Sequence, residues 1–482
     1  MDNKPFIHTF KTPCGFYFFD VNTNQIVDVD EKTYQYLQNM ADVPDLHVEK
    51  ELTKLKSQGY LSNKRPLRMT PIKDDFLEHC LNEKIAQLTL QVTRNCNFKC
   101  SYCLYTAGDS ANHRSHSSQK MTLEMAIACV DFFWTRSKSQ GKIAIGFYGG
   151  EPLLEFDLIK NVVYYAEKMF EGRDLNFVMT TNGSLFNDEN IEFLSKHNFN
   201  IMVSIDGTPE VHNQSRKFAY NGEGTFHIIE KNLKKIKNVS PEFFKNFSFS
   251  VVMDPRNKYD ELQKMFSIED IFEGKNMRST IMDDYYMTEK VTFSDEYMIE
   301  RSIHEFKSYL SILGKYTNNK SSGFTKNNII TEYKKNKSTM KKQKTLIDEM
   351  SHSGPCVPGQ QKLFVTVNGD FIPCEKVNEM SDVMCIGNIY DGFDYEKIRK
   401  LLDIVKLTEK NCINCWAIQH CTQCARNCDN NGELSAKLKE SYCKDIKYNV
   451  EKFFKEYVMF KELGNKIRGN NNGKLQNSGI SL

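Results

Sequence analysis

Alternating strand and helix patterns in the first half of this chain constrain its fold more than any other feature. The expected strands are short, apolar and rich in β-branched or aromatic residues, and they span residues 85–93, 143–150, 176–184, 200–207 and 247–255. The expected helices carry apolar residues at helical spacing, and they span residues 123–137, 158–170, 188–198 and 226–237. Strict alternation predicts a parallel sheet covered by helices, and in a β/α barrel the functional residues follow the strands.

The remaining segments predict smaller units on either side of this α/β core, which we place at residues 85–283. Residues 1–80 predict a separate α+β unit, with two strands around the turn "NTNQ" followed by helices. Residues 284–350 are polar and rich in lysine, which predicts a helical bridge, and residues 351–455 are rich in cysteine. The Gly- and Asn-rich end of the chain predicts a flexible tail at 456–482.

Charge and hydropathy exclude some classes of partner. Among 482 residues, 64 are Lys or Arg and 62 are Asp or Glu, so the net charge of +2 gives no reason to expect nucleic acid. We find no basic-then-apolar signal segment and no apolar run long enough to span a membrane, so we expect a cytoplasmic protein. Disulfides are a poor explanation for fifteen cysteines in the cytosol, and metal or redox chemistry is the better expectation.

Three cysteines, Cys96, Cys100 and Cys103, follow the first strand of the core as C-x3-C-x2-C, and we call them the first group. Three thiolates can converge on one metal centre, but no fourth cysteine lies nearby to complete it. An iron–sulfur cube normally takes four cysteines, so three would leave one iron open, which indicates chemistry rather than structure. A structural zinc site completed by a distant histidine is the alternative.

This motif, at the end of the first strand and with Tyr102 directly before its last cysteine, resembles that of the radical S-adenosylmethionine (SAM) superfamily. The resemblance implies a partial (β/α)6 barrel, and a [4Fe–4S] cluster held by the first group whose open iron binds SAM. It further implies that the reduced cluster cleaves SAM to a 5′-deoxyadenosyl radical, which abstracts a hydrogen atom from the substrate.

Further residues at strand ends fit SAM by the same resemblance. In "YGGEP" (148–152), the glycines would let backbone groups approach a ligand, and Glu151 could accept a hydrogen bond from an ammonium group. Arg216 lies twelve residues after Ser204 and could bind a carboxylate, although by itself it would predict only a solvated surface charge. The residues implied to bind SAM are Tyr102, Gly149, Gly150, Glu151, Asn182, Ser204 and Arg216.

A second set of cysteines near the C-terminus includes two C-x2-C pairs, which indicates metal binding. The set comprises Cys356, Cys374, Cys412, Cys415, Cys421, Cys424, Cys428 and Cys443. It resembles the SPASM extension of radical SAM enzymes, which holds two auxiliary [4Fe–4S] clusters, so three clusters are implied for the chain. Two structural zinc sites are the alternative.

The SPASM resemblance divides these cysteines into two groups. Cys412, Cys415, Cys421 and Cys443 form the outer group. Cys356, Cys374 and Cys424 form the inner group, with Cys428 as the rival of Cys424 because the spacing departs from the pattern after Cys421. Lys362 stands where sulfatase-maturing relatives have a further cysteine, so one inner iron would be open to a substrate thiolate.

Residues 1–80 resemble the winged-helix-like element with which peptide-modifying SPASM enzymes bind the leader of a ribosomally made precursor, by adding it as a strand. We therefore expect a thioether-forming maturase of the sactipeptide or ranthipeptide type, with a cysteine-containing precursor and a flavodoxin- or ferredoxin-type electron donor. The alternatives are formylglycine formation in a sulfatase, a carbon–carbon peptide crosslink, a zinc-stabilised interaction protein or a dithiol redox protein. Lys362 and the N-terminal element argue against sulfatase maturation.

Overall fold

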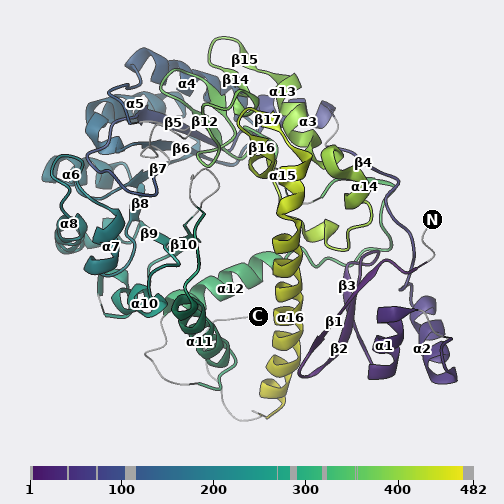
Figure 1. Cartoon of the computed structure of the whole chain (residues 1–482). Coiled ribbons are helices and arrows are strands. Elements are labelled where there is room, and N and C mark those ends of the chain that lie inside the picture. The colour runs from purple at the N-terminus through teal and green to yellow at the C-terminus, as the bar shows by residue number, and fades with distance from the viewer. Residues whose placement is uncertain are drawn as a thin grey trace.

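A computed structural model describes residues 4–40, 43–71, 74–103, 116–268, 270–282, 290–316, 323–352, 354 and 356–470. Its centre is an eight-stranded sheet of order β10-β9-β8-β7-β6-β5-β12-β13 (Figure 1). The six strands of the core are parallel: β5 (Gln87–Thr93), β6 (Lys142–Gly149), β7 (Asp174–Thr181), β8 (Asn200–Ser204), β9 (Phe247–Met253) and β10 (Met277–Ile281). The expected α/β fold with a parallel sheet is confirmed, and β10 is an additional strand.

Two short strands of the cysteine-rich region extend this sheet beyond β5. β12 (Leu363–Val365) pairs with β5 in parallel, and β13 (Phe371–Ile372) pairs with β12 in antiparallel fashion. The C-terminal region is therefore joined to the core by backbone hydrogen bonds as well as by side-chain packing.

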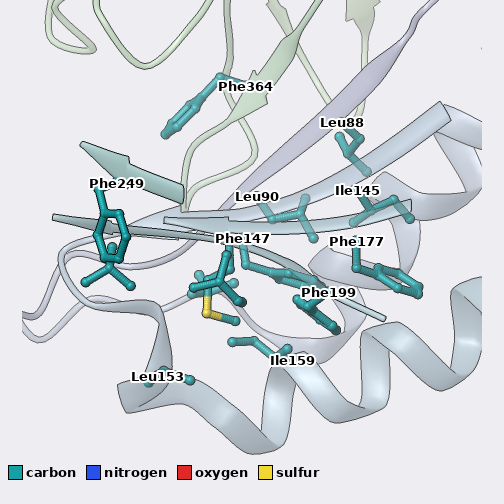
Figure 2. Close-up of a cluster of buried hydrophobic side chains, with 14 of the residues drawn as sticks. Leu88, Leu90, Ile145, Phe147, Leu153, Ile159, Phe177, Phe199, Phe249 and Phe364 are labelled. Carbon is teal, nitrogen blue, oxygen red and sulfur yellow. The ribbon is translucent and has the colours of Figure 1, made fainter. Parts of the chain in front are cut away.

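Helices cover the outer face of the parallel strands. They are α4 (Leu123–Arg136), η1 (Pro152–Glu155), α5 (Phe156–Met169), α6 (Asp188–Lys196), α7 (Pro209–Ser215), α8 (Phe226–Val239), α9 (Pro241–Phe244), α10 (Tyr259–Ile268) and η2 (Asp270–Phe272). The rings of Phe147 and Phe177 lie 5.8 and 5.3 Å from that of Phe199. Figure 2 shows these rings on the same side of the sheet as Ile159 of α5, whereas Phe364 of β12 lies on the opposite side. Alternating side chains thus face the helices and the barrel interior.

The N-terminal unit is a three-stranded antiparallel sheet with two helices. Its elements are β1 (Ile7–Thr12), β2 (Gly15–Asp20), β3 (Gln25–Val29), α1 (Glu31–Asn39) and α2 (Leu46–Ser57). Phe18 packs on the two helices, and Phe19 packs on the opposite face of the sheet against the long helix α16 (Cys443–Asn470). The sequence predicted two strands rather than three. A third helix, α3 (Asp74–Glu83), packs into the barrel core through Leu77 and Leu81.

The bridge contains α11 (Asp295–Ile312) and α12 (Gly323–Lys337), and β11 (Glu349–Met350) pairs with β4 (Arg68–Met69). The cysteine-rich region adds η3 (Asp382–Met384), β14 (Gly387–Asn388), β15 (Gly392–Phe393), α13 (Tyr395–Leu402), η4 (Asp403–Thr408), α14 (Glu409–Cys412), η5 (Ile418–His420), η6 (Ala425–Cys428), β16 (Asp429–Asn430), β17 (Glu433–Leu434) and α15 (Ala436–Ser441).

The helix α16 runs between the bridge helices and the N-terminal sheet (Figure 1). The sequence predicted a flexible tail from residue 456. The structure instead continues α16 to Asn470 and buries the side chains of Val458 and Phe460. These apolar residues pack against the bridge, which explains why the helix persists. The rest of the expected tail, 471–482, lies outside the described residues. Among the helices that the structure describes, none combines the length and the apolar character that crossing a membrane requires.

Candidate metal centres

The first group lies in the loop after β5, and its thiols are close enough to influence one another. Cys100 is buried, and Cys96 and Cys103 are half-buried. Burial raises the pKa of the Cys96 thiol, and Glu151, Cys100 and Cys103 raise it further. Burial also raises the pKa of Cys100 to about 12. Because metals bind the thiolate, a cationic centre would favour the deprotonated form that this apolar environment opposes.

The two glycines of "YGGEP" are required by a close approach between β6 and the segment that precedes Cys96. A β carbon on Gly149, whose φ is +138°, would lie 2.1 Å from the carbonyl oxygen of Thr93. A β carbon on Gly150 would lie 2.1 Å from the carbonyl oxygen of Asn95. The structure shows that these glycines admit the backbone that positions the cysteine loop. That they also admit a ligand stays a prediction.

Glu151 is fully buried and joins the ends of β6 and β7. Its Oε1 accepts hydrogen bonds from the Thr181 hydroxyl (2.7 Å) and the Leu153 amide (3.1 Å), and its Oε2 accepts one from the Asn182 amide (2.7 Å). Burial raises the pKa of Glu151 to about 7, although these three donors oppose the shift. A carboxylate can accept about four hydrogen bonds, so Glu151 retains capacity for a cationic amino group.

Asn182 connects the end of β7 to the cysteine loop. Its Nδ2 donates to Asn97 Oδ1 at 2.8 Å and lies 3.9 Å from Cys96 Sγ, while its Oδ1 accepts from the Ser184 amide and hydroxyl. The side chain therefore positions the loop around Cys96. Ser204, another residue expected at the site, is the last residue of β8 and is half-buried.

Arg216 is buried beside the first group and is not a solvated surface charge. Its Nε donates to Asp206 Oδ2 at 2.7 Å, and its guanidinium lies 5.4 Å from the centroid of the Tyr102 ring. The Tyr102 hydroxyl also donates to Asp206, and the positive charge of Arg216 lowers the pKa of Cys100 against the effect of burial. Asp206 was not identified from the sequence, although it lies only two residues after Ser204.

The outer group lines one cavity of about 390 Å³, so the structure brings its four cysteines together. Burial raises the pKa of Cys415, and the neighbouring thiols of Cys412 and Cys443 contribute. Lys439 also lines this cavity and is 1% exposed. Its Nζ donates to the Thr408 hydroxyl at 2.7 Å and to Cys412 Sγ at 3.8 Å.

The three thiols of the inner group interact electrostatically. Burial raises the pKa of Cys356 to about 11, and the thiols of Cys374 and Cys424 raise it further. Cys428 is fully buried, and its Sγ donates to the carbonyl oxygen of Cys424 at 3.8 Å. The thiol of Cys424, and not that of Cys428, is among the groups that raise the pKa of Cys356, which favours Cys424 as the third member of this group.

Lys362 lies near the inner group, and its Nζ pairs with the carboxylate of Glu375 at 3.0 Å. Its charge favours the thiolate form of Cys374. Across the described residues, no three His, Cys, Asp or Glu side chains lie close enough together to bind one metal ion. In the cube that the motifs imply, each thiolate binds a different iron atom.

Comparison with known proteins identifies the core of the chain. Residues 90–267 match the sequence profile of the Radical SAM superfamily. These residues are a radical SAM domain. The superfamily implies SAM and a [4Fe–4S] cluster. The thiols of the first group, of which that of Cys100 is buried, the spare acceptor capacity of Glu151 and the buried Arg216 fit these two groups.

Two curated relatives match part of this chain. The chain is 28% identical over 194 residues to a cysteine-type anaerobic sulfatase-maturating enzyme of Clostridium novyi, which covers 39% of this chain and 49% of that enzyme. It is 26% identical over 189 residues to the sporulation killing factor maturation protein SkfB of Bacillus subtilis, which covers 39% of each chain. The matches thus span about half or less of these relatives.

The fold is also similar to a solved structure, that of native anSMEcpe with bound AdoMet. The TM-score is 0.57 at 21% identity, and the similarity covers 80% of this chain and 99% of that one. It extends well beyond the radical SAM domain, which supports a common architecture for most of the chain.

Proposed function

We propose that this protein is a radical SAM enzyme that joins a cysteine sulfur of a precursor peptide to a carbon atom of the same peptide. The observation that carries the proposal is the inner group, in which, beyond the effect of burial, the thiols of Cys374 and Cys424 raise the pKa of Cys356 and the thiol of Cys424 raises that of Cys374. Lys362, paired with Glu375, stands nearby where a fourth cysteine would complete the set. Three thiolates leave one iron of a cube without a protein ligand, and a substrate thiolate fits that position.

The first group is proposed to hold the cluster that binds SAM. Glu151 lies near Cys96 and Arg216 lies near Cys100, so an acidic and a basic side chain flank this group. That arrangement complements an amino acid, whose ammonium would contact Glu151 and whose carboxylate would contact Arg216. SAM and its cluster, when bound, supply the abstraction of a hydrogen atom from a substrate carbon. Asp206 fixes the Arg216 guanidinium by two hydrogen bonds, which leaves its other N–H groups for a ligand.

The chemistry requires an electron acceptor. Forming the thioether removes one hydrogen atom from the carbon, and closure of the C–S bond releases one proton and one electron. The outer group offers four thiols in one cavity, enough to ligate a complete cluster at which that electron could reside. A flavodoxin- or ferredoxin-type protein is the proposed external electron partner.

The N-terminal sheet is the proposed site for the leader of the precursor. Its order β1-β2-β3 leaves β3 as an edge strand, to which an extended peptide can add by backbone hydrogen bonds. Peptide recognition is supported by a similar structure, that of native anSMEcpe with bound AdoMet and Kp18Cys peptide, and SkfB is by name a maturation protein.

The test is mass spectrometry of a cysteine-containing peptide encoded beside this chain, after incubation with SAM and reductant without oxygen. We expect loss of two hydrogens and of one free thiol. Cys100→Ala should abolish both SAM cleavage and the crosslink, whereas Cys374→Ala should abolish only the crosslink. Cys14→Ala, which changes an exposed cysteine outside the three groups, is the control. A crosslink formed by the Cys374→Ala variant would refute the assigned role of the inner group.

Sulfatase maturation is the second candidate, favoured by the 28% identity to the Clostridium novyi enzyme. It predicts an aldehyde in a sulfatase peptide and no dependence on a leader. Deleting residues 1–71 separates the two candidates, because only the thioether reaction should then lose affinity for its peptide. The metal content tests both against zinc, since three cubes require about twelve irons and as many sulfides per chain.

A further inference from the structure

We propose that Lys439 and His352 donate hydrogen bonds to the cluster of the outer group and raise its reduction potential. The inference rests on the proposed function, which places a cluster in this cavity. Neither Lys439 nor His352 belongs to the cysteine pattern, and both are proposed to influence the reduction potential of that cluster. Both line the same cavity as the four cysteines.

Lys439 is a buried cation that lacks an acidic partner within the described part of the chain. Only 1% of the residue is exposed, and its Nζ contacts a hydroxyl, that of Thr408, and a thiol, that of Cys412. A buried ammonium is costly unless a negative charge compensates it. Glu440, which also lines the cavity, is exposed and instead accepts a hydrogen bond from Asn411. A cluster ligated by four thiolates is anionic and would supply the missing charge.

His352 provides a second, independent indication of a ligand in the cavity. Its Nδ1 accepts a hydrogen bond from the Gly354 amide at 3.2 Å, so in the neutral ring the hydrogen is on Nε2. That Nε2 is buried and has no hydrogen-bond partner among the described residues, and the residue is 4% exposed. A buried donor without an acceptor is uncommon in folded proteins. The sulfur atoms of a cluster would be its acceptor.

Both donors would act in the same direction on the electron affinity of the site. Reduction adds negative charge to the cluster, and a nearby ammonium or N–H group stabilises that charge. The other lysines of the cavity, Lys410 and Lys447, are exposed, so water screens their charges. The buried pair should therefore set the potential, and the outer site would be the better electron acceptor because of it.

The experiment is a potentiometric titration of the full chain, loaded with clusters without oxygen and followed by electron paramagnetic resonance. The Cys96→Ala/Cys100→Ala/Cys103→Ala background leaves only the two auxiliary clusters to report. In that background, Lys439→Met should lower one of the two reduction potentials by about 59 mV or more. For a one-electron couple this shift is a tenfold change in the reduction equilibrium. His352→Phe should shift the same signal in the same direction by less, and Lys439→Arg should stay near the parent.

Lys447→Met is the matched control, because it removes an exposed lysine from the same cavity. Unchanged potentials in both Lys439→Met and His352→Phe, with iron and sulfide retained, would overturn the inference. If Lys439→Met cannot hold its iron, the direction of the His352→Phe shift decides alone. Failure of the proposed function is seen separately, as a wild-type chain that carries three clusters and forms no thioether.

Discussion

Replacing Gly150 with alanine tests whether the "YGGEP" glycines hold the first cysteine loop in place. The new β carbon would lie 2.1 Å from the carbonyl oxygen of Asn95 and 2.5 Å from its carbonyl carbon, which are backbone atoms that cannot rotate away. Relief requires β6 or the 93–95 segment to move, which strains the 2.9 Å hydrogen bond from the Glu151 amide to Asn95. Overpacking costs about 1–3 kcal/mol and a lost hydrogen bond about 1 kcal/mol, so we expect the free energy of unfolding to fall by about 2–4 kcal/mol.

The assays are denaturant unfolding and the release of 5′-deoxyadenosine from SAM, both without oxygen. Because Asn95 directly precedes Cys96, we expect SAM cleavage by Gly150→Ala to fall more than tenfold even where the protein remains folded. Gly141→Ala is the matched control, since a β carbon there has no atom within 4 Å, and we expect a change within about 0.5 kcal/mol. If Gly150→Ala proves as stable and as active as Gly141→Ala, the close approach is not what requires glycine.

Three further predictions concern other contacts of the chain. Asp206→Ala leaves the buried charge of Arg216 without its partner, so thermal unfolding should reveal a loss of about 3 kcal/mol. The pKa of Glu151 is raised from 4.5 to about 7, so the folded state holds its proton more tightly than the unfolded state. In the cluster-free protein this stabilisation is fully present below pH 4.5. The free energy of unfolding should therefore fall by about 3 kcal/mol as the pH rises through 7. That pH dependence should be absent from unfolding curves of Glu151→Gln. Trp416→Ala removes a ring stacked on His8 at 3.6 Å, so limited proteolysis should cut the N-terminal unit faster.

The alternating pattern was sufficient to predict most of the core, because its longer strands and helices show their own periodicity. It did not reveal β10, whose sequence "MRSTI" mixes polar and apolar residues. It also missed β12, a run of three residues that is a strand because β5, far away in the sequence, lies beside it. Short strands of this kind are determined by their partners, which a local pattern does not contain.

Those residues around the first group that belong to motifs at the ends of strands could be predicted from the sequence. The sequence identified Arg216 and Tyr102 as separate residues, yet their roles depend on Asp206, which binds both side chains. Nothing in the sequence shows that an aspartate in "VSIDG" meets a tyrosine 104 positions away. The need for glycine at this point could not be traced to the backbone either, because the sequence does not show which segment lies opposite Gly149.

The outer group and the N-terminal sheet share a segment of chain, which no motif indicated. Residues 415–421 begin and end with cysteines of the outer group, and the side chains between them contact the sheet. The Trp416 ring stacks on His8 with an interplanar angle of 6°, and His420 Nε2 lies 2.9 Å from Asn24 Oδ1. The segment that carries two thiols of the cavity is thus also a docking surface for the proposed leader-binding sheet.

The helix α16 repeats this arrangement. It begins at Cys443, the fourth member of the outer group, and its Phe454 packs on Phe19 of β2 with ring centroids 4.4 Å apart. Two separate segments therefore anchor the sheet at one position and contribute thiols at another. Because a metal centre fixes the segments that ligate it, loading the outer site should also fix the sheet relative to the barrel. On this argument, loading the outer site should raise the affinity for the proposed precursor, because the N-terminal sheet is its proposed binding site.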